Sequence, residues 1–488
     1  MCVVCSDPET ARAAGIDPCL CGAPQTLAAY ARVEADISRR QMIGGMAAVV
    51  GMFAGFGLAP TELRAQTAAR PRLLTNMRFF DGNTLSMQEG RNILIIGNRI
   101  AGFPELDARP EGAEVIDCGG RSVIPGLIDA HWHSTLVAVS MLVAMTQDVG
   151  FIHLMAGREA GATLMRGFTT VRDVGGPAFG LKMAIDRGVV SGPRIFPSGA
   201  MISQTSGHGD FRLLSELPRF PDTPPNNIER QGVALVADGA DAVLRAAREQ
   251  LMKGASQIKI MAGGGVSSLY DPLDTTQYTE REMRAAVEAA EDWGTYVCAH
   301  VYTPGGIRRS VAAGIKSIEH GQLADEDTVR LMADEGVFWS LQPFLADEDS
   351  NPKSDPIQQA KQMEVAEGTV RAFELAKQYD VPLAFGTDIL FNPEGTSSQG
   401  RQLAKFARFM SPLEALQKAT GSAGQLLALS GARSPYDGAL GVISEGALAD
   451  LLIVDADPEA GLDWLDDPQG RINLIMKDGR IVKDDLQA

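Results

Sequence analysis

Two histidines separated by one residue follow an apolar run near the first quarter of the chain. The run begins at Val123 and leads through Asp129 to His131, Trp132 and His133. Residues two apart in a strand point to the same side, so the two histidines share one face while Trp132 points away. Imidazoles in this arrangement suit zinc and its neighbours, and catalytic zinc sites keep one position open for water. By itself the pair is a weak signal, since loop histidines without a metal are the alternative.

Other residues with metal-binding side chains lie within or at the end of later apolar runs. The chain has only six histidines, and four of them close predicted strands, which argues against a random scatter. His153 lies in an apolar run without ligand partners, and we interpret it as structural. The candidates beyond the first pair are Lys259, His300, His320 and Asp388.

Eight short apolar runs alternate with helical stretches through the middle of the chain. A helix is expected from Ala240 to Lys253, and Thr279 with Glu282 has the spacing of a capping box that opens another. This alternation predicts an α/β fold, a (β/α)8 TIM barrel whose chemistry lies at the C-terminal ends of the strands. The runs start at Val123 and continue at 168–173, 194–196, 257–260, 296–300, 317–320, 338–341 and 383–388.

Short strands joined by turns flank this region on both sides. They occupy 73–80, 92–96 and 99–103 before it, and 449–455 and 472–482 after it. Runs of this length, bounded by turn residues, are typical of β hairpins. We predict that residues 69–125 and 436–488 combine into one small β-sandwich domain beside a barrel of residues 126–435.

Residues 1–68 have the character of a leader. Arg39 and Arg40 precede an uncharged run from Met42 to Pro60 that is rich in glycine and alanine. This pattern resembles a twin-arginine export signal and predicts a periplasmic or otherwise exported protein, without stable membrane association after signal removal. The alternative is an uncleaved membrane anchor, because the 19 residues of this run are just enough to span a bilayer.

Charge and cysteine content limit the other classes of function. The chain carries 44 basic and 61 acidic residues, a formal net charge of −17, and nucleic acid is therefore not an expected partner. Cys118 and Cys298 are expected to act as small buried residues, and no disulfide framework is implied. A zinc knot is the less favoured interpretation of the four N-terminal cysteines, Cys2, Cys5, Cys19 and Cys21.

In combination, the motifs resemble those of the metal-dependent amidohydrolase superfamily. The similarity is greatest to the imidazolonepropionase-like branch that includes Xaa-dipeptidases and ochratoxin-hydrolysing enzymes, and it runs from about residue 70 to the end of the chain. The motifs that carry it are PGLIDAHWH at 125–133, IKIMAGGG at 258–265, AH at 299–300, IEHG at 318–321 and GTD at 386–388.

The resemblance implies a centre of two divalent metal ions, expected to be zinc. An ammonium group cannot bind a cation, but burial lowers the pKa of a lysine, and the neutral amine can add carbon dioxide to become N6-carboxylysine. A surface lysine is the alternative, although an apolar strand offers it little water. The implied ligands are His131, His133 and Asp388 for one ion, His300 and His320 for the other, and Lys259 as a carbamate between them.

The same resemblance implies the roles of the reacting groups. A water molecule between two cations would be a hydroxide at ordinary pH, and Asp388 would pass its proton to the leaving nitrogen. His208, in the long irregular segment 201–227, would face the carbonyl or carboxylate of the substrate, and Tyr270 and Tyr302 are candidate carboxylate contacts. A loop histidine that caps backbone groups, and tyrosines that only pack, are the alternatives.

The expected reaction is hydrolysis of an amide bond to an amino acid with a free carboxylate. Dipeptides, N-acyl amino acids and ochratoxin-like amides are the expected small-molecule substrates. A cyclic-amide hydrolase with the same metals, and a metal-binding scaffold without catalysis, are the alternatives. Related enzymes often form homo-oligomers, commonly octamers, and the resemblance implies the same assembly here.

Overall fold

The computed structural model describes residues 70–220, 222–268, 270–351 and 353–486. Residues Ala68–Ala488 form one compact unit. The predictions for the leader, namely the export signal and the cysteines from Cys2 to Cys21, lie outside the described residues. Within the described residues, none of the helices combines the length and hydropathy needed to cross a bilayer.

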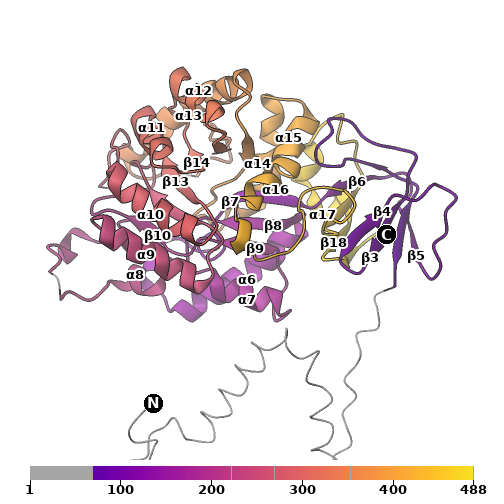
Figure 1. The fold of residues 1–488 in the computed structure, drawn as a ribbon, viewed down its shortest axis with the longest axis horizontal. Helices are drawn as coiled ribbons and strands as arrows, with labels where there is room; N and C mark the ends of the chain where they lie inside the picture. The colour runs from indigo at the N-terminus through magenta and orange to yellow at the C-terminus, as the bar shows by residue number, and fades with distance from the viewer. Residues whose placement is uncertain (1–69, 221, 269, 352, 487–488) are drawn as a thin grey trace, which may run out of the picture. The chain divides into compact units, whose positions relative to one another are not determined.

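Two parallel sheets occupy the centre of this unit (Figure 1). Every residue of the strands from β12 to β16 is buried, which explains their nearly continuous apolar sequences. The first sheet has the order β7 (Leu127–Trp132), β8 (Phe168–Asp173), β9 (Arg194–Pro197). The second has the order β11 (Ala234–Val236), β10 (Met201–Ser203), β12 (Ile258–Met261), β13 (Val297–Val301), β14 (Ser317–His320), β15 (Phe338–Leu341), β16 (Leu383–Phe385).

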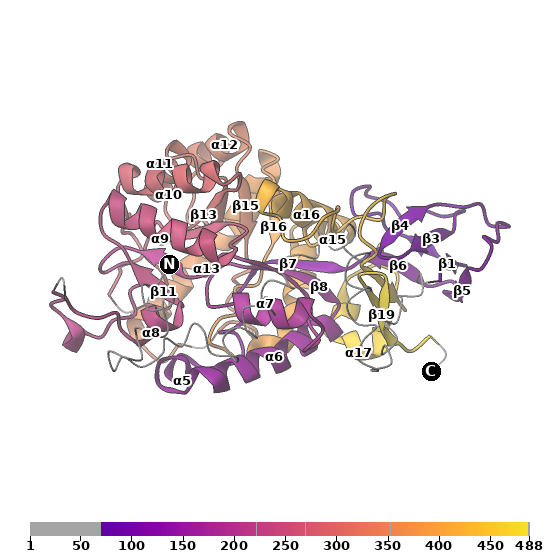
Figure 2. The same ribbon diagram turned by 60° about the horizontal axis from the view of Figure 1, so that its bottom comes forward.

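Helices connect these strands and cover them. In Figure 2, α6 (Val149–Met165) and α7 (Phe179–Asp186) lie on one side of β7 and β8, with α15 (Pro412–Lys418) and α16 (Gly421–Ala428) on the other. The predicted helix is confirmed as α9 (Ala240–Lys253). The remaining helices are α5 (Met141–Thr146), α8 (Asn227–Gln231), α10 (Glu280–Asp292), α11 (Pro304–Ala312), α12 (Glu326–Asp334), α13 (Pro356–Gln378), α14 (Gln399–Ala404) and α17 (Pro468–Arg471).

Helix α10 shows how local sequence sets these elements. The Thr279 side chain accepts a hydrogen bond from the Glu282 backbone N–H, and the Glu282 side chain reaches back, which confirms the predicted capping box. The helix buries Met283, Ala286, Val287 and Ala290. Their spacing of three and four residues places them on one face, which packs against the sheet.

Two predictions about the strands are wrong. The apolar run from Val123 is divided between β6 (Ser122–Pro125), which belongs to another sheet, and β7. The chain passes between them at Gly126, where a Cβ atom would lie 2.1 Å from the Thr169 hydroxyl oxygen, so only glycine fits there. The predicted irregular segment 201–227 begins with β10, which pairs in parallel with β12.

The ends of the two parallel sheets approach each other. The Asp388 backbone N–H, just after β16, donates to the His131 carbonyl oxygen of β7 at 2.9 Å. Among the described strands, no ladder pairs β16 with β7 or β9 with β10. Complete closure of the barrel therefore stays a prediction.

Both flanks of the chain contribute to a further pair of sheets. Strand β6 pairs antiparallel with β17 (Leu451–Val454), so the two flanks meet in one sheet. Leu74 and Ile95 of one sheet share a core with Ile453 and Leu474 of the other. The sandwich arrangement and the domain bounds stay predictions. The other strands are β1 (Arg72–Thr75), β2 (Arg78–Phe79), β3 (Ile93–Ile96), β4 (Arg99–Gly102), β5 (Glu114–Asp117), β18 (Ile472–Lys477) and β19 (Arg480–Asp484).

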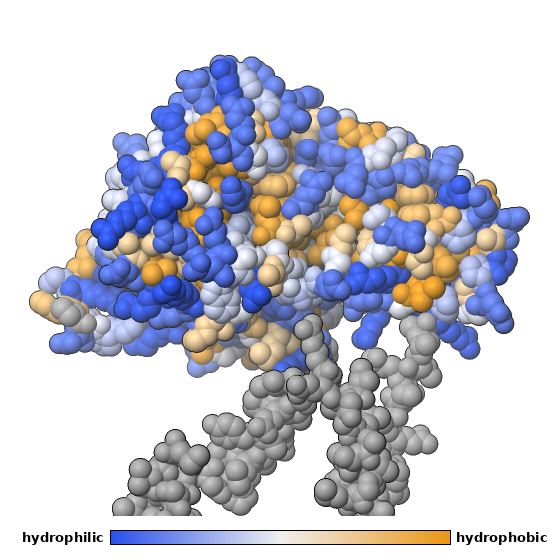
Figure 3. All heavy atoms as spheres, in the orientation of Figure 1, coloured by the Kyte–Doolittle hydropathy of each residue, from blue (hydrophilic) through white to orange (hydrophobic). Residues whose placement is uncertain are grey.

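One face of the molecule is mostly polar. The face shown in Figure 3 carries mainly hydrophilic side chains, with hydrophobic ones gathered in smaller areas between them. Cys118 and Cys298 are buried and free, as predicted. The apolar side chains are thus packed inward, where they hold the strand ends that carry the candidate site.

Candidate metal centre

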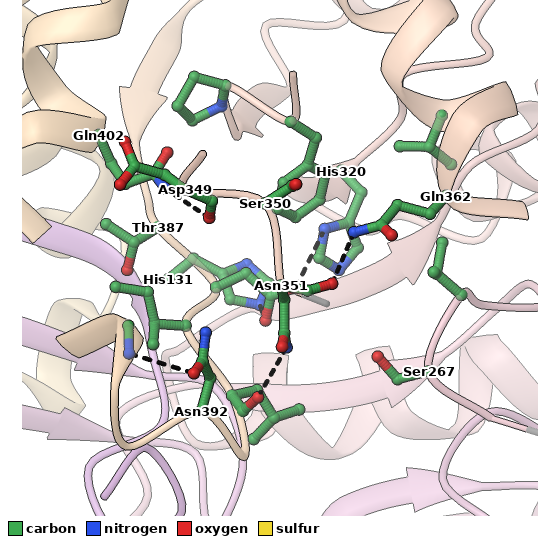
Figure 4. Close-up of a pocket in the computed structure, with 18 of the residues that line it drawn as sticks. His131, Ser267, His320, Asp349, Ser350, Asn351, Gln362, Thr387, Asn392 and Gln402 are labelled. Carbon is green, nitrogen blue, oxygen red and sulfur yellow. Dashed lines mark hydrogen bonds and ion pairs between the residues drawn. The ribbon is translucent and has the colours of Figure 1, made fainter. Parts of the chain in front are cut away.

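The predicted ligands come together at the C-terminal ends of the parallel strands. His131 belongs to β7, and Asp388 follows β16 by three residues. His208 and Tyr302 line the same pocket, part of which Figure 4 shows around His131 and His320. The predicted ligands that line this pocket are His131, His133, Lys259, His300, His320 and Asp388.

Asp388 lies among three of these histidines. Its Oδ1 is 3.3 Å from Nε2 of His131 and 3.2 Å from Nε2 of His133, and its Oδ2 is 3.9 Å from Nδ1 of His320. Burial by itself would raise the pKa of Asp388, but the charges and hydrogen bonds of these histidines hold it well below its usual value. Ligand atoms of His131, His320 and Asp388 lie within 4.8 Å of one another, a spacing that suits one metal ion.

Outer hydrogen bonds orient the two histidines of the H-x-H pair. Nδ1 of His131 lies 2.8 Å from Oε2 of Glu319, and Nδ1 of His133 lies 2.9 Å from the carbonyl oxygen of Gly175. A carboxylate and a carbonyl only accept, so each ring donates from Nδ1 and keeps the lone pair of Nε2 for a metal ion. In this tautomer Nε2 is the nitrogen that could bind a metal ion.

The other two histidines are held in a similar way. Nδ1 of His320 lies 2.8 Å from Oε1 of Gln342, which leaves Nε2 of that ring without a protein partner among the described residues. In His300 the roles are reversed, because Nε2 lies 3.1 Å from the carbonyl oxygen of Gly264 and Nδ1 is the nitrogen left over. Each imidazole thus has one nitrogen held by an outer partner and one left for a metal ion, and for His131 and His133 that second nitrogen faces Asp388. Such a set of nitrogen and oxygen donors fits divalent zinc.

Lys259 is buried among these groups, with 1% of its surface exposed. Burial lowers its pKa, and the negative charge of Glu319 opposes that effect. Within the part of the chain that the structure describes, no hydrogen bond or ion pair reaches its amino group. A buried amine without a partner is costly, and the cost is removed if the nitrogen carries a carboxylate that binds metal.

Two of the candidate ligands have unusual backbone conformations. His320 has φ 72° and Asp388 has φ 52°, both in the left-handed region. Non-glycine residues adopt it at a cost, and such strain gathers at functional sites. Close contact also constrains the end of β16, since a Cβ atom on Gly386 would lie 2.4 Å from Cβ of His131.

Glu319 and Arg172 support the centre, and the sequence did not reveal their roles. The Arg172 guanidinium donates to both carboxylate oxygens of Glu319, at 2.7 and 2.6 Å, and neither side chain is exposed to solvent. Burial would raise the pKa of Glu319, but Arg172 and His131 keep it well below its usual value. Both residues lie inside predicted strands, and a charged residue at such a position was the signal available in the sequence.

His208 lies beside the predicted ligands, where it was expected to face the substrate. Its ring stacks on the ring of His300, with centroids 3.9 Å apart. Nδ1 of His208 lies 2.7 Å from the Ser268 hydroxyl and 3.1 Å from Oδ2 of Asp271, two partners that the sequence did not predict. Its Nε2 has no protein partner among the described residues, and its role toward the substrate stays a prediction.

Gly265 provides a test of the position of this ring. A Cβ atom there would lie 2.0 Å from Cε1 and 2.1 Å from Nδ1 of His208. We expect Gly265→Ala to displace the ring and to lower kcat/KM for amide substrates by about tenfold to a hundredfold, because misplaced contacts weaken substrate orientation. Gly180→Ala on α7 meets no atom within 4 Å and is the matched control. Equal kcat/KM values for the two variants would contradict the placement of His208.

The two predicted tyrosine contacts differ in position. Tyr302 is buried, and its ring lies 5.1 Å from that of His320. Tyr270 is 43% exposed and is not among the residues that line the pocket, and its contact with a substrate carboxylate stays a prediction. The carbonyl oxygen of Tyr270 accepts a hydrogen bond from the Ser206 hydroxyl. This bond holds the Tyr270 backbone against the loop of Ser206, while the side chain is exposed. His153 lies on α6 outside the pocket lining, in line with a structural role.

Residues 122–482 match the sequence profile of the amidohydrolase family. The chain belongs to this family. The match covers both the H-x-H pair and Asp388, and it confirms the family expected from the motifs.

Named relatives of this amidohydrolase are known from sequence and from structure. An ochratoxinase of Aspergillus niger is 32% identical over 329 residues, which cover 66% of this chain and 66% of the relative, just under two thirds of its length. A solved prolidase complexed with N-methylphosphonate-L-proline is 36% identical with a TM-score of 0.77, covering 85% of this chain and 100% of the other. A Xaa-Pro dipeptidase with methionine in its active site is 29% identical with a TM-score of 0.73, at 85% and 100% coverage.

Proposed function

We propose that this amidohydrolase hydrolyses amide bonds to an amino acid that carries a free carboxylate. The observation that carries the proposal is the pocket in which Asp388 meets the imidazoles of His131 and His133 beside the buried Lys259. The relatives named ochratoxinase, prolidase and Xaa-Pro dipeptidase support a peptide-like amide as the substrate. N-acyl amino acids and dipeptides are the compounds that fit this class.

The donor set fits two divalent metal ions, for which we propose zinc. His131, His133 and Asp388 would hold one ion, and His300 and His320 the other. Lys259 would act between the ions as N6-carboxylysine. When bound, the ions would lower the pKa of a water molecule toward neutrality and polarise the amide carbonyl.

The protein groups then position the substrate and move the proton. Asp388 would be ionised at neutral pH, because its pKa is held well below the usual value. Its carboxylate would take the proton of the attacking water. It would then give this proton to the nitrogen of the leaving amino acid. Glu319 orients the ring of His131 through the 2.8 Å contact between its Oε2 and Nδ1 of the ring. Nε2 of His208 would contact the carbonyl or carboxylate of the substrate.

The proposal includes the architecture and assembly expected from the sequence. We infer that the two parallel sheets are arcs of one (β/α)8 barrel, supported by the hydrogen bond from Asp388 to the His131 carbonyl. The two flanking sheets would form the β-sandwich. The homo-oligomer and export through a twin-arginine signal rest on the sequence.

Removal of metal is the first test. We expect dialysis against a chelator to abolish hydrolysis of N-acyl amino acids and dipeptides, and added zinc to restore it, since the protein groups alone provide no activated water. The metal-loaded protein is then screened against dipeptides, N-acyl amino acids and lactams, with metal analysis of the same sample. Preference for lactams would indicate a cyclic-amide hydrolase. Full activity in protein shown to be free of metal would contradict the metal-dependent mechanism.

A further inference from the structure

Two cationic side chains of the described pocket lining have no anionic partner, and one of them, Lys259, is already a candidate metal ligand. Among the described residues that line the pocket, the cationic side chains are Lys259, Lys353 and Lys405. Lys405 is neutralised, because its Nζ lies 2.7 Å from Asp347 and 2.8 Å from Asp349. Lys353 donates only to the neutral hydroxyl of Ser267, at 3.1 Å. Lys353 therefore retains donors and a positive charge for a ligand.

The surrounding structure fixes Lys353 in this position. Lys353 precedes α13, and its carbonyl oxygen accepts from the Gln359 side chain at 2.8 Å. On the facing loop, the Ser267 carbonyl oxygen accepts from the Gln358 side chain at 2.7 Å. Both partners of the Lys353–Ser267 contact are thus anchored to the first turns of one helix, which holds the ammonium in place before a ligand arrives.

A neighbouring lysine shows the difference between a structural and an available ammonium. Lys361, in the second turn of α13, donates to the carbonyl oxygens of Gly265, Ser268 and Asp271. Its three donors are used, and they hold the loop that carries the partners of His208. Lys353 uses one donor toward the same loop.

The two sides of the pocket differ in charge. In Figure 4, Ser267 and Gln362 lie on one side, and Asp349, Gln402 and Thr387 lie on the other. Lys405 is paired with the carboxylates of the acidic side. Apart from the candidate ligand Lys259, the cation of the described lining that an anion would meet without a carboxylate partner is Lys353, beside Ser267. Burial lowers the pKa of Lys353, and the negative charge of Asp388 opposes this, which places the ammonium within electrostatic reach of the reacting groups.

We propose that the Lys353 ammonium binds the free carboxylate of the leaving amino acid, with the Ser267 hydroxyl as a second donor. This inference rests on the proposed function and names the residue that selects its substrate class. A hydrogen bond between a partly desolvated ammonium and a carboxylate is among the stronger contacts in proteins. It also holds the leaving nitrogen in a fixed position relative to Asp388.

The test compares matched acid and amide substrates in the metal-loaded, full-length protein. N-acetylphenylalanine and its carboxamide are assayed with the wild type and with Lys353→Met, Lys353→Gln and Lys353→Arg. We expect Lys353→Met and Lys353→Gln to lower kcat/KM for the acid by about tenfold to a hundredfold, and to lower it much less for the carboxamide, which has no charge to pair with the ammonium. Lys353→Arg keeps the charge and should recover most of the loss. Lys316→Met, at an exposed position before β14, is the control.

A binding measurement keeps this inference separate from the proposed reaction. Calorimetry compares phenylalanine, the expected product, with phenylalaninol, which lacks the carboxylate. A preference for phenylalanine that disappears in Lys353→Met supports the inference, even if no tested amide is hydrolysed and the proposed function fails. Two results would overturn the inference about Lys353. One is a preference for the acid that persists in folded Lys353→Met and Lys353→Gln, and the other is equal kcat/KM of the wild type for acid and carboxamide. In both cases hydrolysis of the amide bond would still uphold the proposed reaction.

Discussion

Replacing Lys259 by Ala is expected to lower kcat/KM for amide hydrolysis by about a thousandfold or more, since metal ions supply several kcal/mol of transition-state stabilisation and about 1.4 kcal/mol corresponds to tenfold. Lys259 is buried, and among the described residues no hydrogen bond or ion pair reaches its amino group. The variant therefore has no second protein group that is held at this position. The variant should also bind less than two equivalents of metal. Kinetics and metal analysis of the same preparation measure both effects.

Two further measurements distinguish the loss of a metal ligand from the loss of the fold. Lys259→Ala leaves a space that a short carboxylic acid such as acetate or propionate can enter, and it should regain part of its metal and activity when these are added. Lys259→Met fills the same space with an apolar chain and should remain folded but not respond. Full metal content with normal activity in either variant would refute a ligand role for Lys259.

Replacing Arg172 by Met is expected to lower the free energy of unfolding by about 3–5 kcal/mol, the usual cost of leaving one partner of a buried ion pair unpaired. Glu319 would then stay charged in a fully buried position, with neither side chain exposed to solvent in the present structure. Urea denaturation of the metal-free proteins measures the difference. The metal-free state is chosen because bound metal would stabilise the folded form separately.

The double variant Arg172→Met/Glu319→Gln is the matched control. The amide introduced by Glu319→Gln has no charge to leave unpaired, and its carbonyl oxygen can still accept from Nδ1 of His131. We expect the double variant to recover most of the lost stability. If it is as unstable as Arg172→Met, the loss comes from packing around the guanidinium and not from the buried charge.

The sequence was informative where chemistry and structure are local. A helix such as α9 follows from the spacing of apolar residues, and the cap at Thr279 follows from two residues three apart. The family was recognised from short motifs, because histidine is rare in this chain, with six in all, and four of the six stand at the ends of predicted strands. The predicted ligands His131 and Asp388 meet in the structure even though they are far apart in the chain.

Only the tertiary structure shows which distant groups touch. Glu319 lies 188 positions from His131 and yet contacts its Nδ1, and the Lys353 contact spans 86 positions to Ser267. Such contacts depend on the order and register of neighbouring strands and on the loops between them, which local periodicity does not encode. The division of the first strand at Gly126 is a further case, since it follows from the approach of Thr169 on β8. By itself the sequence determined the family and its candidate ligands, whereas tertiary packing decided how each candidate ligand is oriented and that Lys353 contacts a neutral hydroxyl while Lys405 contacts two carboxylates.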